Sequence, residues 1–278
     1  MFSKKIIEVP IDFSKSSLNA LEYAIEFANN AGGDIRMIFV KKHKDYEPEF
    51  MLEKYVTEGV NSLEELFENL IKKYKNTFKG SFDYKIREGN TAEEITNQAK
   101  YDDAFMIMMG THGVSGFQEL WVGSNAYRVV SIAPCPVLTV RPQYKFKGIN
   151  KIVMPVDVTD TTRQKVNITA SIAKAFGAKV EVLGVRETDY PKVIKTITNY
   201  MDQVCDVLEK MGVVYSRELV KCDNITDCTI EHATKVDADL ITIMTEQPTN
   251  FWDVILGKYA QQMINHSHIP VLSIRPQN

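Results

Sequence analysis

Short apolar runs alternate along this chain with longer stretches whose apolar residues recur every three or four positions. Runs at residues 35–40, 105–109 and 137–140 are typical of strands that are buried on both faces. The stretches at 18–28 and 63–74 place their apolar residues on one side of a helix. Strands that alternate with helices predict an α/β fold, in which helices cover both faces of a parallel sheet.

The first half contains further signals of the same kind. We expect strands at 6–9 and 82–87, and we expect glycines 32 and 33 to end the first helix. Thr91-Ala92-Glu93-Glu94 has the spacing of a capping box and predicts that Thr91 caps the next helix. Residues 41–56 mix basic, acidic and aromatic side chains, so we interpret them as a loop or lid.

The second half repeats the first. Pro10-x-Asp12-x-Ser14 returns as Pro155-x-Asp157-x-Thr159, and the segment 135–142 returns as 269–276. Between these landmarks we expect strands at 152–156, 180–185, 213–219, 240–244 and 271–274, with helices at 170–176, 194–211 and 227–235. The pattern predicts two domains, 1–142 and 149–278, joined by a linker at 143–148. Each is a doubly wound parallel sheet of about five strands.

Composition narrows the class of protein. The 278 residues are 44% hydrophobic and carry a net charge of −3, which gives no basic excess for nucleic acid. Four cysteines are too few for a disulfide framework in a chain of this length, so we expect a reducing compartment. Without an apolar stretch long enough for a membrane span, we interpret the chain as cytoplasmic, with no membrane partner.

Candidate chemistry lies where the strands of the first domain end, because ligands of open parallel sheets bind beyond the carboxyl ends of their strands. Asp12 follows the first strand, and a loop with Gly110 and Gly113 follows the fourth. Gly123-Ser124 then stands at the expected start of a helix. Glycines let main-chain N–H groups approach phosphate oxygens, and a helix N-terminus adds further donors. A plain tight turn remains the alternative.

The motif Gly110-x2-Gly113-x9-Gly123-Ser124 resembles the nucleotide-binding signature of universal stress proteins of the ATP-binding type. The flanking segments 108–113 and 135–140, and Pro10-x-Asp12-x-Ser14, are similar to the same family. The resemblance covers both halves of the chain. It implies two tandem Rossmann-like domains of the adenine nucleotide alpha hydrolase type, a role in the stress response, and binding of ATP, ADP or AMP, with Mg²⁺ as an accompanying ion.

The resemblance also implies roles for individual residues. The base and ribose would meet Pro10, Ile11, Asp12 and Val40. Residues implied to wrap the ribose and the phosphates are Met109, Gly110, His112, Gly113, Gly123, Ser124, Asn125 and Ala126. Asn125 and Ala126 depart from the family pattern in side chain, which leaves their main-chain donors in place. We expect His112 to make a ligand contact rather than to act as a general base.

The second domain lacks most of this motif. Its loop at 244–250 has no glycine, Pro248 removes a donor, and Glu246 would repel phosphate. Gly257-Lys258 remains as a remnant that we interpret as one residue out of step. We therefore expect no triphosphate binding of the same kind there, and a structural role or a different ligand instead.

Three functions remain open on the sequence. The chain is a nucleotide-dependent sensor with little or no turnover, a slow ATPase, or an interaction scaffold without a ligand. The apolar last strands at 137–140 and 271–274 are expected to pair with each other within the chain. Association of two chains into a homodimer is left open.

Overall fold

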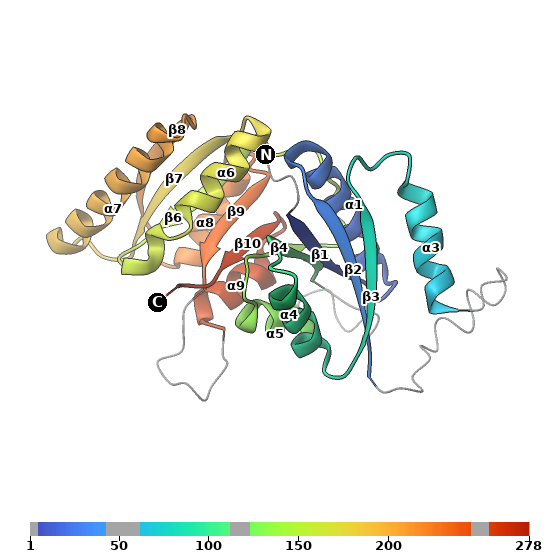
Figure 1. Cartoon of the computed structure of the whole chain (residues 1–278). Coiled ribbons are helices and arrows are strands. Elements are labelled where there is room, and N and C mark those ends of the chain that lie inside the picture. The colour runs from blue at the N-terminus through green and yellow to red at the C-terminus, as the bar shows by residue number, and fades with distance from the viewer. Residues whose placement is uncertain (1–4, 43–61, 112–122, 246–255, 278) are drawn as a thin grey trace.

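Ten strands form one continuous sheet with helices on both faces (Figure 1). The computed structural model describes residues 5–42, 62–111, 123–245 and 256–277. The strand order is β3-β2-β1-β4-β5-β10-β9-β6-β7-β8, so each half of the chain supplies five neighbouring strands. The predicted α/β fold with two doubly wound halves is confirmed.

The first half supplies, in chain order, β1 (Ile6–Pro10), α1 (Lys15–Ala31), β2 (Asp34–Lys41), α3 (Leu63–Tyr74), β3 (Phe82–Glu88), α4 (Thr91–Tyr101), β4 (Met106–Gly110), α5 (Ser124–Ile132) and β5 (Val137–Val140). The second half supplies β6 (Lys151–Val156), η2 (Asp160–Arg163), α6 (Val166–Phe176), β7 (Lys179–Arg186), α7 (Pro191–Lys210), β8 (Tyr215–Lys221), α8 (Ile225–Lys235), β9 (Leu240–Met244), α9 (Lys258–His266) and β10 (Val271–Ile274).

These elements match the sequence pattern, with local differences. The helix expected to be capped by Thr91 is capped by Asn90, whose side chain accepts from the amide of Glu93, so Thr91 is its first helical residue. Asn is as good an N-cap as Thr, and the extended backbone of Asn90 suits the role. Of the predicted lid at 41–56, residues 43–56 lie outside the described residues.

Two hydrophobic cores lie on opposite faces of the sheet. One is formed with α1, α3, α6 and α7, and the other with α4, α5, α8 and α9. Side chains alternate between the cores along each strand, as in β4, where Met106 and Met108 face the first and Ile107 and Met109 the second. Each core contains residues of both halves, so the two domains share their interior. None of the helices in the described part of the chain is long and apolar enough to cross a membrane.

The two halves join through β5 and β10. This pair is antiparallel, with Leu138 opposite Leu272, whereas the other neighbouring strands of the sheet are parallel. Thr139 Oγ1 also donates to the carbonyl of Val271 at 3.3 Å. The predicted pairing of the two last strands within the chain is confirmed, and it removes one exposed edge from each half.

The segment that we interpreted as a linker packs closely between the halves. Asn19 on α1 donates through Nδ2 to the carbonyl of Tyr144 at 2.8 Å, and the ring of Phe146 meets Tyr23 edge-on at 5.0 Å between centroids. Phe27 of α1 also contacts Phe176 of α6, with 5.1 Å between the ring centroids. These aromatic contacts hold α1 against α6 and tie the orientation of one half to the other.

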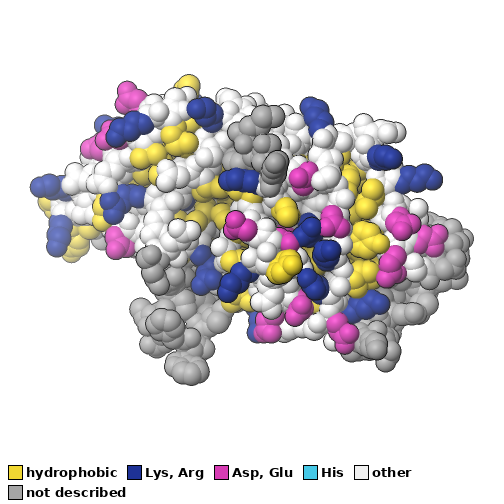
Figure 2. Space-filling view, viewed as in Figure 1, with side chains coloured by type: hydrophobic (Ala, Val, Ile, Leu, Met, Phe, Trp, Pro, Cys, Tyr) yellow, Lys and Arg dark blue, Asp and Glu magenta, His cyan; other side chains and the backbone are white. Residues whose placement is uncertain are grey.

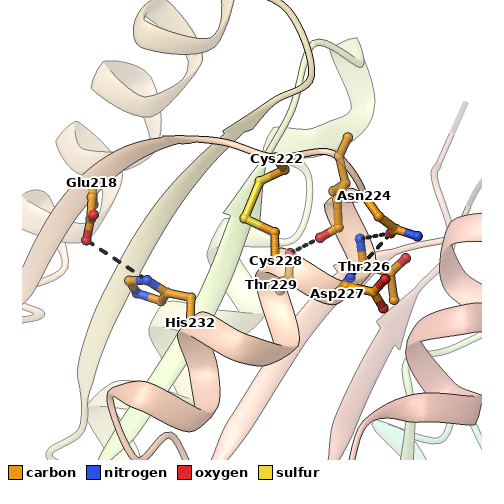
Figure 3. The surroundings of a disulfide bond; sticks show 9 residues. Glu218, Cys222, Asn224, Thr226, Asp227, Cys228, Thr229 and His232 are labelled. Atoms are coloured by element: carbon orange, nitrogen blue, oxygen red, sulfur yellow. Dashed lines mark hydrogen bonds and ion pairs between the residues drawn. A yellow bond between two sulfur atoms is a disulfide. The ribbon is translucent and has the colours of Figure 1, made fainter.

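A disulfide bond joins Cys222, just after β8, to Cys228 in the first turn of α8 (Figure 3). Between them Asn224 caps α8, accepting from the amides of Thr226 at 2.8 Å and Asp227 at 3.3 Å. The cysteine count gave no reason to expect this bond, whereas Cys135 and Cys205 are free. The two cysteines meet because the strand end and the helix start are adjacent, which their spacing alone does not reveal.

We predict that replacing both bridged cysteines, Cys222→Ala with Cys228→Ala, lowers the free energy of unfolding by about 2 kcal/mol without reductant, because the bond closes a short loop in the unfolded chain. Urea unfolding of parent and variant, each with and without dithiothreitol, measures this difference. Reductant should remove most of it. Titrating thiols in the denatured, unreduced parent should detect only Cys135 and Cys205, and finding all four cysteines as thiols would contradict the bond.

Candidate functional site

The candidate site begins with three apolar side chains at the carboxyl ends of β1, β2 and β4. Pro10 is the last residue of β1, Val40 lies near the end of β2, and Met109 precedes the last residue of β4. Val40 and Met109 belong to the same face of the sheet, and Pro10 pairs with Ile38 of that face. Pro10 and Val40 are partly exposed, and Met109 is buried. We call these three residues the apolar floor.

Asp12 shapes the turn that leads from β1 into α1. Its Oδ1 accepts from the amide of Ser14 at 3.0 Å, and its own amide donates to Ser17 Oγ at 3.3 Å. The second half builds the same turn, with Asp157 Oδ1 accepting from the amide of Thr159 at 2.9 Å. One carboxylate oxygen of Asp12 therefore serves the fold, and Oδ2 accepts no hydrogen bond from the described residues. Ile11, also predicted to contact the ligand, is buried and its amide donates to the carbonyl of Ile38.

Phe13, beside Asp12, has a left-handed backbone with φ of 61°. For a bulky residue this conformation costs about 1–3 kcal/mol, so the surrounding structure must impose it. The ring is buried and packs against Phe39 and Phe67, with centroids 6.2 and 5.2 Å away. The packed ring fixes the direction in which the Asp12 turn leaves the sheet.

Gly110 ends β4 directly against the first turn of α1. A Cβ at this position would lie 2.8 Å from both the carbonyl carbon and the carbonyl oxygen of Ser16, and would also collide with Ser16 Oγ. Because carbon atoms do not approach so closely, glycine is required for α1 to begin where it does. The sequence suggested that Gly110 makes room for phosphate, and the structure adds that it makes room for α1.

The first turn of α5 presents main-chain donors beside the end of β4. The amide of Gly123 donates to the carbonyl of Thr111 at 2.7 Å, which fixes the start of α5 next to that strand. No side chain caps the helix, and the amides of Ser124, Asn125 and Ala126 have no acceptor among the described residues. Ser124 and Asn125 are exposed, whereas Ala126 is buried. Free amides and the positive end of the helix dipole favour an anion here.

The structure thus brings together the described members of the predicted site at one edge of the sheet. Pro10 and Gly110 are the last residues of the neighbouring strands β1 and β4, Asp12 follows β1, and α5 begins beside β4. His112 and Gly113 lie outside the described residues. Ser16 and Thr111 were missed by sequence reasoning, although each is what positions a neighbouring site residue. In the sequence, Ser16 and Thr111 are marked only by a hydroxyl side chain near the end of a strand, and such residues are common in turns.

The second half differs at the equivalent of Gly110. Thr111 and Thr245 make matching hydrogen bonds to the ends of β5 and β10, so Met244 occupies the position of Gly110. A buried methionine side chain therefore stands where the first half has a glycine against α1. Here the chain after Asp157 forms the short 3₁₀ helix η2, and α6 begins only at Val166, whereas α1 begins three residues after Asp12.

A buried lysine lies in this altered turn. Lys165 Nζ donates to the carbonyl of Thr162 and, at 3.0 Å, to Thr162 Oγ1. Burial lowers the pKa of Lys165 to about 8, an effect that the nearby Asp157 opposes. The equivalent region of the first half is the regular first turn and a half of α1. The two strand ends therefore have different shapes and different chemistry.

The remnant Gly257-Lys258 is in step with the first half, which corrects the sequence interpretation. Gly257 precedes α9 with φ of −56° and ψ of 149°, and Gly123 precedes α5 with φ of −58° and ψ of 146°. Counting from Met244 rather than from the missing glycines gives the same spacing in both halves. The helix start is thus preserved in the second half, and the strand end is what has changed.

The second half also touches the candidate site. The amide of Leu256, just before α9, donates to the hydroxyl of Tyr127 at 3.0 Å, and Tyr127 lies one residue beyond the free amides of α5. Leu256 is buried in the core shared by both halves. A contact between the halves therefore supports the first turn of α5.

Neither the surface charge nor the hollow found in the structure points to a ligand at the candidate site. On the face drawn in Figure 2, Lys and Arg side chains are interspersed with Asp and Glu. A hollow of about 290 Å³ lies elsewhere, in the second half between η2, α6 and α7, and is lined by Asp160, Arg163, Gln164, Val166, Gln203, Val204 and Val207. Arg163 in this hollow is held by Gln203 and by the ring of Tyr200. Every residue that lines this hollow belongs to the second half and none to the candidate site, so we assign the hollow no part in the site.

Comparisons with known proteins agree on one family. The family model described as "Universal stress protein family" matches residues 4–141 and again residues 148–275. Universal stress protein YxiE of Bacillus subtilis is 30% identical over 152 residues, which cover 51% of this chain and 100% of that protein. A universal stress protein of Methanocaldococcus jannaschii is 32% identical over 152 residues, covering 51% of this chain and 84% of its own.

The fold of the whole chain is also found among solved structures. The crystal structure of a universal stress protein from Archaeoglobus fulgidus DSM 4304 has a TM-score of 0.77 at 17% identity, and covers 97% of this chain and 98% of its own. At this identity the likeness shows the fold alone. It shows that two such domains in one chain form a known architecture.

We predict that Gly110→Ala lowers the free energy of unfolding by about 1–3 kcal/mol, because the new methyl group overpacks against Ser16. Chemical denaturation of parent and variant measures the change. Adding Ser16→Gly should recover only part of the loss, since the carbonyl group of residue 16 still meets the methyl group. Unchanged or increased stability in Gly110→Ala would show that α1 does not depend on this close approach.

Proposed function

Since the chain belongs to the universal stress protein family, with two tandem domains, we propose that its N-terminal domain binds an adenine nucleotide and acts as a sensor in the stress response. The observation that carries the proposal is the set of three free amides at Ser124, Asn125 and Ala126. They lie at the start of a helix beside the end of a central strand, where phosphate groups are commonly bound.

The neighbouring groups suit the rest of such a ligand. The apolar floor offers a surface on which a base can pack, and the free Oδ2 of Asp12 can accept from a ribose hydroxyl or an adenine amino group. The hydrogen bond from Gly123 to Thr111 holds the amides of α5 beside the end of β4. An apolar surface, one acceptor and several amide donors together match a nucleoside phosphate better than inorganic phosphate alone.

Binding rather than rapid turnover is what these groups favour. Phosphoryl transfer requires cationic groups that stabilise the charge developing on the phosphate. The apolar floor, residues 12–14 and the first turn of α5 contain no cationic side chain, and the nearest lysine along the chain is Lys15 at the start of α1. A Mg²⁺ ion would arrive with the nucleotide, and we assign it no protein ligand. A slow ATPase is the competing function, and a ligand-free scaffold is the third.

The C-terminal domain has a supporting role in this proposal. Met244 replaces the glycine at the end of the strand, and the turn at Lys165 differs from the Asp12 turn. The nucleotide would therefore meet a strand end of the wrong shape. Through Leu256 and Tyr127 the domain instead supports α5 of its neighbour. We propose the cytoplasm as its compartment, where adenine nucleotides are abundant. A homodimer would form through surfaces other than β5 and β10, which already pair within the chain.

A proline at position 124 tests the amide donors with little effect on the fold. Proline suits the first position of a helix, and Gly123 already has the extended backbone that a residue before proline adopts. We predict that Ser124→Pro weakens ATP and ADP binding about 10- to 100-fold. The variant lacks one main-chain amide that would donate to a phosphate oxygen, and it also lacks the Ser124 hydroxyl. Isothermal titration calorimetry measures the affinity.

The C-terminal domain provides a matched control. Lys258→Pro makes the same change at the start of α9, after a glycine of nearly identical backbone angles. It should leave the nucleotide affinity unchanged, and Ser124→Ala should separate the hydroxyl from the amide. Equal affinity in parent and Ser124→Pro would disprove the placement of the phosphates. Conversion of bound ATP to ADP in a single-turnover assay would favour the slow ATPase.

A further inference from the structure

A glutamate lies unpaired inside the N-terminal domain. Glu8 is the middle residue of β1, and its side chain is fully buried. Neither carboxyl oxygen has a hydrogen-bond partner within the described part of the chain. An ionised carboxylate in such a place would be costly, because burial removes water and no donor replaces it.

The strand register shows what surrounds Glu8. It pairs with Arg36 on β2 and with Ile107 on β4, and Arg36 pairs in turn with Asp83 on β3. In a parallel sheet, paired residues point to the same face, which here is the face covered by α4 and α5. The charged and titratable groups around Glu8 are Arg36 from β2, Asp83 and Arg87 from β3, Asp102 at the end of α4, and Cys135 before β5.

The charged neighbours satisfy one another without Glu8. Arg36 donates to Asp83 at 2.6 Å and also binds Asp102, whose other oxygen accepts from Gln98 at 2.6 Å. Gln98 accepts in turn from Arg87 Nε at 2.8 Å. Two carboxylates and two guanidinium groups sum to zero charge. An ionised Glu8 would therefore add an uncompensated negative charge to a closed, neutral network.

The other half of the chain shows that the fold does not require a carboxyl group here. Val153 occupies the same place in β6, since it pairs with Glu181 on β7 and with Ile241 on β9. Val153 is fully buried as well. A valine thus meets the packing needs of this position, and the glutamate of the first half adds only the ability to take up or release a proton.

We propose that Glu8 is a proton-responsive switch, buried as a neutral carboxylic acid, that stabilises the N-terminal domain as the pH falls and destabilises it when the group ionises. This inference stands on burial, the closed network and the duplicated fold, and does not depend on nucleotide binding. Glu8 lies on β1, two residues before Pro10, so its ionisation disturbs the strand that leads into the candidate site.

The direction of the pH effect follows from linkage. Burial, with a smaller contribution from Asp102, raises the pKa of Glu8 from 4.5 to about 9, while Arg36 and Arg87 oppose the shift. Between these two values the folded protein holds one more proton than the unfolded chain. The stabilising effect of the neutral acid is therefore complete below pH 4.5, falls as the pH rises, and is lost by about pH 9.

The test compares the pH dependence of stability in the full-length parent with that in Glu8→Gln and Glu8→Val, the latter supplying the residue of the second half. Urea unfolding is measured in half-unit steps between pH 5.5 and 8.5. Relative to either variant, we expect the unfolding equilibrium constant of the parent to rise up to about tenfold per pH unit, the effect of one proton. Glu93→Gln, an exposed change on α4, should follow the parent.

Infrared spectroscopy gives a direct second readout. At neutral pH the folded parent should show the carbonyl stretch of a protonated carboxyl group, and Glu8→Gln should lack it. The proposal is overturned if the parent and both Glu8 variants share one pH dependence, or if the band is missing from the folded parent at neutral pH. A variant that fails to fold leaves the other variant and the infrared band of the parent to decide.

Discussion

The close approach of α1 to the end of β4 at Gly110 decides what each half of this chain can do. Where the strand ends in glycine, α1 starts directly beside it, and α5 with its free amides begins next to the same strand end. Where the strand ends in Met244, the same turn becomes a 3₁₀ helix. Lys165 is buried in that turn and donates to Thr162. The presence or absence of a side chain at this strand end thus accompanies two different turns in the two halves.

The halves nevertheless work as one body. The antiparallel pairing of β5 with β10 joins their sheets, and the packed segment around Phe146 joins α1 to α6. Because of this joining, Leu256 of the second half can hold Tyr127 at the start of α5. A domain that has lost the features of a nucleotide site can therefore still matter to one, by supporting the helix that would carry the phosphates.

Much of this architecture follows from the sequence, and the failures have physical reasons. Apolar runs such as β4 predict buried strands because every side chain of a central strand must be buried. Spacing alone did not reveal that Asn90 competes with Thr91 as cap, or that Cys222 and Cys228 meet. These depend on where a strand end falls relative to the next helix. The sequence does not single out Glu8, because its isolation arises only when β2, β3 and α4 pack around β1.

Backbone amide chemical shifts offer the most direct test of the central claim that the N-terminal domain alone binds a nucleotide at the start of α5. In a titration of the ¹⁵N-labelled full chain with ADP, the amides of Ser124, Asn125 and Ala126 should shift and saturate together. The amides of the equivalent turn of α9 should stay in place. Equal shifts in both helices, or shifts in α9 alone, would contradict the account, as would no shift at α5 with ADP in excess.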